Sequence, residues 1–163
     1  MITYGVITVS DKGFRGDRVD LSGKEIIRIL DDLDFSIGDY RIIPDEKDII
    51  KSTILEFSDA RKFDLVITTG GTGVSPRDVT PDATLEVIER EIPGMAEAMR
   101  RESLLKTPHA MISRAVAGIR GESLIINLPG SPGGAKDNLA VILPTLKHTI
   151  EKIKGDQSDC VPV

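Results

Sequence analysis

The chain has 163 residues, 40% of them hydrophobic, and a formal net charge of -5 at pH 7. This length allows one buried core and is too short for two ordinary domains, so we expect a single domain over residues 1–163. Because the net charge is negative, the sequence gives no sign of a basic surface that would bind nucleic acid or an anionic membrane. Because aromatic residues make up only 4%, the core must be mainly aliphatic, which is typical of parallel sheets.

Targeting signals are not apparent in the sequence. A strand pattern begins at the N-terminus without a basic leader, and the longest apolar runs fall far short of the roughly 20 residues that span a bilayer. The single cysteine, Cys160, has no partner for an intramolecular disulfide, which favours a reducing compartment. We therefore expect a cytoplasmic protein.

Three buried strands are expected in the first half of the chain. They are short runs rich in β-branched residues, at 4–9, 40–43 and 64–69, and each stops at a polar, proline or glycine-bearing turn. The turn after the first run is Ser-Asp-Lys-Gly, and the turn after the third is Gly-Gly-Thr-Gly.

Helices are expected around these strands. Ser22 and Glu25 have the spacing of a capping box, so the first helix is predicted to begin at Ser22. Apolar residues at helical spacing follow Asp45, which is placed to cap the second helix. A third helix, capped by Thr80, should end before Pro93, where a fourth begins.

The second half is expected to end with a strand pair and a long helix. Residues 113–119 and 123–128 predict two antiparallel strands, because the link between them is too short for a crossover. The last helix begins near Ser131, and Pro144 is predicted to kink or interrupt it. The tail, 155–163, loses its apolar periodicity and is expected to fray.

The alternation of strands and helices predicts an α/β fold, a three-layer α/β/α sandwich around a mostly parallel but mixed central sheet. In such folds, ligands collect at loops beyond the carboxyl ends of the strands. Three loops have that position, and they follow Val9, Thr69 and Leu128.

The loop after the third strand is a candidate anion site. It consists of Thr69, Gly70, Gly71, Thr72 and Gly73. Its glycines let backbone N–H groups converge on a phosphate, and its threonines add hydroxyl donors. A tight turn between a strand and a helix explains a bare glycine-rich loop equally well. The loop matches neither the Walker pattern nor GxGxxG, which excludes the common nucleotide motifs.

Carboxylates accompany this loop. A carboxylate beside a bound phosphate is unfavourable unless a cation lies between them, and Mg²⁺ is the usual one. Asp78 is therefore a candidate metal ligand, with a role in local backbone hydrogen bonds as the alternative. Asp45 stands both at a strand end and at a cap position, so both uses stay open. Asp82 is better explained by the helix dipole.

Two further groups of residues are expected at the same rim. Ser10 and Asp11 follow the first strand, and Asp20 and Ser22 stand at the start of the first helix, although capping alone explains Ser22. The second glycine-rich exit, 127–134, suggests another wall for an anion or a base. A rigid turn is an equally good explanation of that segment.

Together these residues resemble a known family, the molybdopterin adenylyltransferases, which includes the bacterial MogA type and the N-terminal domain of gephyrin. The most specific part of the resemblance is the TTGGTG block followed by RDVTPDAT. The remaining matches occur in family order and cover nearly the whole chain: Val9-Ser10-Asp11, Asp20-x-Ser22-Gly23, Ile43-Pro44-Asp45-Glu46, Pro93-Gly94-Met95, Ser113-Arg114 and Asn127-Leu128-Pro129-Gly130.

The resemblance implies an enzyme of molybdenum cofactor biosynthesis that uses ATP and Mg²⁺ to attach AMP to the phosphate of molybdopterin, releasing pyrophosphate. Asp45 and Asp78 would be its essential acids and metal ligands, and the Thr69 to Gly73 loop would lie against the ligand phosphate. The substrate contacts would be completed by Ser10, Asp11, Ser22, Asn127, Pro129, Gly130 and Ser131. The chain would form a homotrimer, with a hexamer as the alternative, and would hand its product to a molybdate-insertion enzyme.

Two rival functions share this fold. A MoaB-type protein has the same pterin pocket but acts as a binding module, and the presence of both acids here favours the enzyme. A molybdate-insertion enzyme has a similar glycine-rich block, but such proteins carry additional domains for which 163 residues leave no room.

Overall fold

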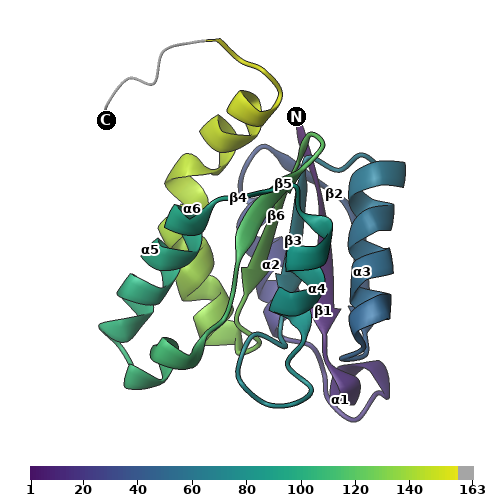
Figure 1. Ribbon diagram of the computed structural model, residues 1–163, viewed down its shortest axis with the longest axis vertical. Coiled ribbons are helices and arrows are strands. Elements are labelled where there is room, and N and C mark those ends of the chain that lie inside the picture. Colours follow the sequence, from purple (N-terminus) through teal and green to yellow (C-terminus); the bar gives the residue numbers. More distant parts are fainter. Residues whose placement is uncertain (158–163) are drawn as a thin grey trace.

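The computed structural model describes residues 1–157 (Figure 1). Its strands are β1 (Ile2–Val9), β2 (Phe35–Ile43), β3 (Leu65–Thr69), β4 (Arg90–Glu91), β5 (Ala117–Arg120) and β6 (Ser123–Leu128). Its α-helices are α1 (Asp11–Phe14), α2 (Ser22–Asp31), α3 (Lys47–Leu55), α4 (Thr80–Val87), α5 (Pro93–Leu104) and α6 (Pro132–Ile153). A π-helical stretch, η1 (Glu56–Ala60), follows α3, and a 3-10 helix, η2 (Pro108–Ile112), follows α5.

The six strands form one mixed sheet in the order β2-β1-β3-β6-β5-β4. The first four are parallel neighbours, whereas β5 runs antiparallel to β6 and β4 antiparallel to β5. The predicted antiparallel pair is thereby confirmed. At the carboxyl ends, Val9 pairs with Ile43, Thr8 with Thr69, and Thr69 with Leu128. Four strands therefore end at the same edge of the sheet.

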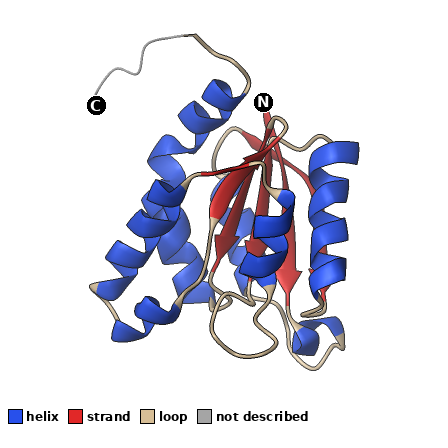
Figure 2. Ribbon diagram, viewed as in Figure 1, coloured by secondary structure: helices blue, strands red, loops and turns tan. Residues whose placement is uncertain are grey.

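Helices cover both faces of this sheet (Figure 2). Alternate residues of each buried strand point to opposite faces, and they enter two separate hydrophobic clusters. On one face, Val6, Ile67 and Ile126 pack with apolar residues of α2, α5 and α6. On the other face, Val66 and Ile125 pack with residues of α3, η1 and α4. The expected three-layer α/β/α architecture is confirmed.

Three predicted helix caps are wrong. No cap residue of α2, α3 or α4 accepts a hydrogen bond through its side chain. Ser22 instead donates to Asp20, whose carboxylate also accepts from the N–H of Gly23. Asp45 accepts from the backbone of a residue far away in the sequence, and Thr80 lies inside the first turn of α4. The local spacing of these residues suggested capping, but in the fold the side chains of Ser22 and Asp45 bond to other partners.

The last helix differs from its prediction at one point. It begins as expected, with Ser131 Oγ accepting from the N–H of Gly134, but it continues without interruption through Pro144. Pro144 is exposed, while Ile142 and Leu146 on either side of it are buried against the sheet. Ala140, whose carbonyl loses its helical donor to the proline, is exposed as well, so the disruption is on the solvent side while the buried side stays continuous.

Other boundaries differ by a few residues. The first two strands are longer than predicted, and the predicted strand at 113–119 begins only at Ala117. The predicted frayed tail begins just after α6 ends, but its residues 158–163, Cys160 included, lie outside the described residues. Within residues 1–157, no helix is long and apolar enough to cross a membrane.

Candidate functional site

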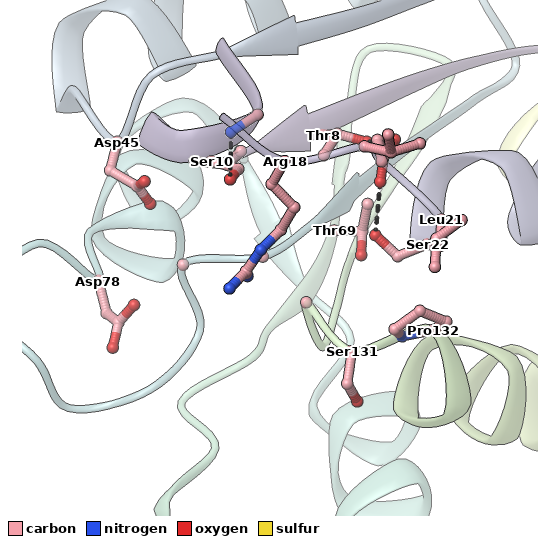
Figure 3. Close-up of a pocket in the computed structure, with 17 residues that line it drawn as sticks. Thr8, Ser10, Arg18, Leu21, Ser22, Asp45, Thr69, Asp78, Ser131 and Pro132 are labelled. Carbon is pink, nitrogen blue, oxygen red and sulfur yellow. Dashed lines mark hydrogen bonds between the residues drawn. The ribbon is translucent and has the colours of Figure 1, made fainter. Parts of the chain in front are cut away.

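A cleft of about 620 Å³ opens at the edge where the four parallel strands end (Figure 3). We call it the phosphate cleft because of the groups described below. Of the acids and substrate contacts that the resemblance implied, nine line it: Ser10, Ser22, Asp45, Thr69, Gly70, Gly71, Asp78, Gly130 and Ser131. Asp20, also expected at this rim, lines it as well. The loops that follow β1, β3 and β6, far apart in the sequence, therefore meet at one site.

The exits of β1, β3 and β6 approach so closely that glycine is required. Gly70 has a φ of 101°, and a Cβ on it would lie 2.3 Å from the carbonyl oxygen of Val9. A Cβ on Gly130 would lie 3.1 Å from the Cα of Gly70. Thr69 Oγ1 donates to the carbonyl of Pro129 at 2.6 Å, which joins the two glycine-rich exits. The hydroxyl of Thr69 is thus engaged in holding the walls of the cleft.

Backbone amides of the same loop are free for an anion. Gly71 has a φ of 65°, and within residues 1–157 no acceptor is found for the N–H groups of Gly71, Thr72 and Gly73. Consecutive N–H groups in a turn with left-handed residues form a concave site for a phosphate oxygen. This arrangement favours anion binding over a simple turn.

Asp45 is held at the rim by a reciprocal pair of hydrogen bonds. The N–H of Asp11 donates to Asp45 Oδ2 at 2.8 Å, and the N–H of Asp45 donates to Asp11 Oδ1 at 3.0 Å. Burial raises the pKa of the Asp45 carboxyl, and the nearby charges of Asp11 and Asp78 add to this rise, against the lowering effect of the Asp11 N–H. A neighbouring cation would relieve that unfavourable charge.

Asp78 provides a second carboxylate in the phosphate cleft. Its Oδ2 accepts from the N–H of Ser75 at 2.9 Å. Among the described residues, Asp78 Oδ1 and Asp45 Oδ1 have no hydrogen-bond partner. Mg²⁺ is commonly held by one or two carboxylates together with substrate phosphates and water. The two free oxygens fit that donor set.

Two arginines fix the loops that carry these acids. Arg77 forms a bidentate contact with Asp11, at 3.0 and 2.9 Å, and an ion pair with Glu46 at 2.9 Å. Arg114 pairs with Asp82 at 2.9 Å and donates to the carbonyl of Gly73 at 2.8 Å. Asp82, attributed to the helix dipole from the sequence, thus serves mainly to anchor Arg114.

Asp20 is a buried carboxylate in the wall of the cleft. It accepts from the hydroxyls of Thr8 at 2.7 Å, Ser22 at 3.0 Å and Tyr40, and from the N–H of Gly23 at 3.1 Å. Burial by itself would raise the pKa of Asp20, but these hydrogen bonds outweigh it, and the pKa is lowered. Asp20 therefore remains ionised and fixes the start of α2 against β1 and β2.

A smaller cavity of about 260 Å³ lies on the other side of the glycine loop. Thr72, Gly73 and Pro129 line it, together with Ser113 and other side chains from α5 and η2. Ser131 lines both this cavity and the phosphate cleft. The two cavities are therefore adjacent, with the glycine loop and Ser131 between them.

Two proposed residues lie outside both cavities. Asn127 is fully buried, and its amide donates to Thr68 and Thr84 and accepts from the N–H of Val116, so it braces β6. Asp11 acts through Asp45, as described above. Sequence reasoning did not single out Arg18, which lines the phosphate cleft. An exposed arginine in a polar loop has no pattern that would have identified it.

Comparisons with known proteins identify the family to which the chain belongs. The chain matches the family model described as probable molybdopterin binding domain over residues 5–148. It is 41% identical over 160 residues to the molybdopterin adenylyltransferase of Helicobacter pylori strain J99, covering 95% of this chain and 89% of that protein.

Solved structures are equally similar. The molybdopterin biosynthesis enzyme MoaB of Thermus thermophilus has a TM-score of 0.91 at 47% identity, covering 96% of this chain and 98% of that one. A structure of MogA has a TM-score of 0.89 at 38% identity, covering 93% and 99%. The chain therefore belongs to the family of probable molybdopterin-binding domains, with a molybdopterin adenylyltransferase, MoaB and MogA among its relatives.

Proposed function

We propose that this protein is a molybdopterin adenylyltransferase of molybdenum cofactor biosynthesis, which transfers AMP from ATP to the phosphate of molybdopterin and releases pyrophosphate. The observation that carries the proposal is that the glycine loop, whose amides at Gly71 to Gly73 are free, borders the cleft that contains the free carboxylate oxygens of Asp45 and Asp78. Amides bind phosphate oxygens, while a pair of carboxylates recruits a divalent cation.

Magnesium would be held by Asp45 and Asp78, as the fit of their free oxygens supports. When bound, Mg²⁺ would offset the negative charge that grows on departing pyrophosphate. The reciprocal hydrogen bonds between Asp11 and Asp45 keep the Asp45 carboxylate oriented before any ligand arrives. This pre-organisation is the main contribution the protein can make to a nucleotidyl transfer.

Little covalent chemistry is required of the side chains. The attacking group is a terminal phosphate oxygen of molybdopterin, which is already ionised near neutral pH and needs no general base. It forms a bond to the α-phosphorus of ATP as the bond from that phosphorus to the pyrophosphate oxygen breaks. The amides of the glycine loop would orient the reacting phosphates.

The two adjacent cavities suggest how two substrates are accommodated. Because Ser131 lines both of them, ligands in the two cavities would meet at that residue. We assign the nucleotide phosphates to the phosphate cleft, since it contains both acids, and the pterin to the smaller cavity behind the glycine loop.

A direct assay tests the function. Purified protein is incubated with molybdopterin, ATP and Mg²⁺, and adenylylated pterin and pyrophosphate are measured. We expect Asp78→Asn to abolish turnover while pterin binding stays nearly intact, because only the metal-facing carboxylate is lost. Asp48→Asn, an exposed acid in the first turn of α3, is the matched control and should turn over normally. Normal turnover by Asp78→Asn would refute the role of that residue.

The alternative function is that of a MoaB-type binding module. The similarity to MoaB of Thermus thermophilus supports this alternative. The same assay separates the two functions, because a module would bind molybdopterin without forming the adenylylated product.

Our remaining proposals concern the context of the enzyme. We propose a single-domain cytoplasmic protein that assembles as a homotrimer, with a hexamer as the alternative, and passes its product to a molybdate-insertion enzyme. A mass measurement in solution by light scattering tests the oligomeric state.

A further inference from the structure

The phosphate cleft is poor in positive charge. Among the described residues that line it, Arg18 is the one cationic side chain, whereas Asp20, Asp45 and Asp78 contribute carboxylates. ATP carries about four negative charges in its phosphate tail at neutral pH. The loop amides and one Mg²⁺ offset only part of that charge, so a further cation is needed.

The other arginines near the cleft are already neutralised. Arg77 is shared between Asp11 and Glu46, and Arg114 is bound to Asp82 and to loop carbonyls. Each of these carboxylates would lose its cation if the arginine turned towards a ligand. A ligand would have to compete with these carboxylates for the guanidinium groups, so Arg77 and Arg114 are less available to a phosphate than an unpaired arginine.

Arg18 lines the cleft and, unlike Arg77 and Arg114, is unpaired among the described residues. It is exposed in the loop between α1 and α2, and within residues 1–157 no hydrogen bond or ion pair is found for its guanidinium. In the view of Figure 3, its side chain extends into the cleft and ends between Asp45 and Asp78 on one side and Thr69 and Ser131 on the other. An unpaired arginine pointing into an anion-binding cleft is available for a ligand.

We propose that Arg18 binds the β- and γ-phosphates of ATP, the pair that leaves as pyrophosphate. The planar guanidinium can contact two phosphate oxygens at once. Asp45 and Asp78, which would hold Mg²⁺ and so offset charge on the nucleotide phosphates, line the same cleft as Arg18. This inference rests on the proposed function and adds a binding residue to it.

Calorimetric titration with three probes tests the assignment: Mg-ATP, Mg-pyrophosphate and AMP. We expect Arg18→Ala to weaken binding of Mg-ATP and of Mg-pyrophosphate about tenfold, because one bidentate charged contact is lost. Binding of AMP, which lacks both distal phosphates, should change by less than about twofold. Arg18→Lys should recover part of the affinity, since it keeps the charge and loses the planar fork.

Arg15→Ala is the matched control. Arg15 lies three residues away, is similarly exposed, and pairs with Asp17 at 3.0 Å without lining the cleft. Its loss should leave all three affinities unchanged. Arg18 is exposed, so its substitution should also leave the unfolding temperature unchanged.

Several results would overturn the assignment. They are wild-type affinity of Arg18→Ala for Mg-pyrophosphate, an equal loss of AMP binding, or no binding of Mg-pyrophosphate by the unaltered protein. Molybdopterin is titrated as a further probe, and a loss of its affinity alone would assign Arg18 to the pterin phosphate and would also overturn the proposal. Failure of the proposed function is distinguishable, because a protein that binds pyrophosphate through Arg18 without making adenylylated pterin would refute only the enzyme activity.

Discussion

At the scale of single residues, Thr80 and Thr84 form an informative pair. Both are fully buried, one turn apart in α4. Thr84 Oγ1 donates to the carbonyl of Thr80 at 2.8 Å and accepts from Asn127 at 2.9 Å. Thr80 Oγ1 has no partner among the described residues, and it lies against Gly71 beside Asp45. The two hydroxyls therefore differ in partners and not in burial.

Substitution by valine should separate these hydroxyls. Thr84→Val should lower the free energy of unfolding by about 1–2 kcal/mol, because Asn127 loses an acceptor. Thr80→Val should leave it unchanged or raise it by up to about 1 kcal/mol, because an unsatisfied polar group is removed at constant shape. Urea denaturation measures both values. Equal losses in the two variants would contradict this account of Thr80.

At the scale of helices and strands, the side chain of Asp64 connects several elements. It lies just before β3 and accepts from the N–H and the hydroxyl of Thr3 in β1, at 2.7 and 3.0 Å. Its other oxygen forms an ion pair with Lys154 at the end of α6. Burial alone would raise the pKa of Asp64, but these contacts outweigh it, and the pKa is lowered. One carboxylate thus ties two strands and the last helix together.

A pH series tests this role. Because the folded-state pKa of Asp64 is depressed, its contribution is fully present above the unfolded-state value of about 3.9 and is lost as the pH falls through the folded-state value. Asp64→Asn should therefore lower the free energy of unfolding by about 2 kcal/mol at neutral pH, and this difference should shrink below about pH 4.

The control for this series is Asp17→Asn, which removes an exposed partner of Arg15. Its effect should stay below about 0.5 kcal/mol. Urea unfolding between pH 7 and pH 3 measures both variants. A difference for Asp64→Asn that did not change with pH would show that its charge is not what stabilises the fold.

Helices and strands were predictable from the sequence where a run of buried apolar residues defines them. The exits of β1, β3 and β6 followed from buried runs that stop at serine, glycine and proline, respectively, and the layers followed from the same runs. The caps at Ser22, Asp45 and Thr80 were not predictable, because Asp20 competes for the first and Asp11 for the second. Local spacing carries no information about such partners.

One strand of the fold and two features of the site were also beyond a single sequence. β4, with two residues, is too short for any periodicity. The division of the ligand site into two cavities depends on how η2 and the loop after β6 approach the glycine loop. Candidate acids could be found by residue type, whereas the pairing that leaves Arg18 free and occupies Arg77 and Arg114 depends on the fold.

At the scale of the whole molecule, ligand binding should be visible as thermal stability. A ligand at about 100 times its Kd stabilises the folded state by about 2.7 kcal/mol. For a chain of this length, that corresponds to a rise in Tm of roughly 5–10 °C. We expect Mg-ATP to produce such a rise and a chelator of Mg²⁺ to abolish most of it.

Differential scanning fluorimetry checks this prediction. Asp45→Asn should show a smaller rise in Tm than the unaltered protein, because one of the two proposed metal ligands is lost. An equal rise with and without the chelator would argue against a metal-dependent nucleotide site.

Ser131 lines both cavities, and this arrangement should affect how fast the product is released. If the two substrates occupy the two cavities as proposed, the joined product spans both of them. It loses translational freedom only once, whereas its precursors each lose it separately. The joined compound should therefore dissociate more slowly than either precursor. Slow dissociation would keep the product on the protein until the protein that catalyses the next reaction removes it.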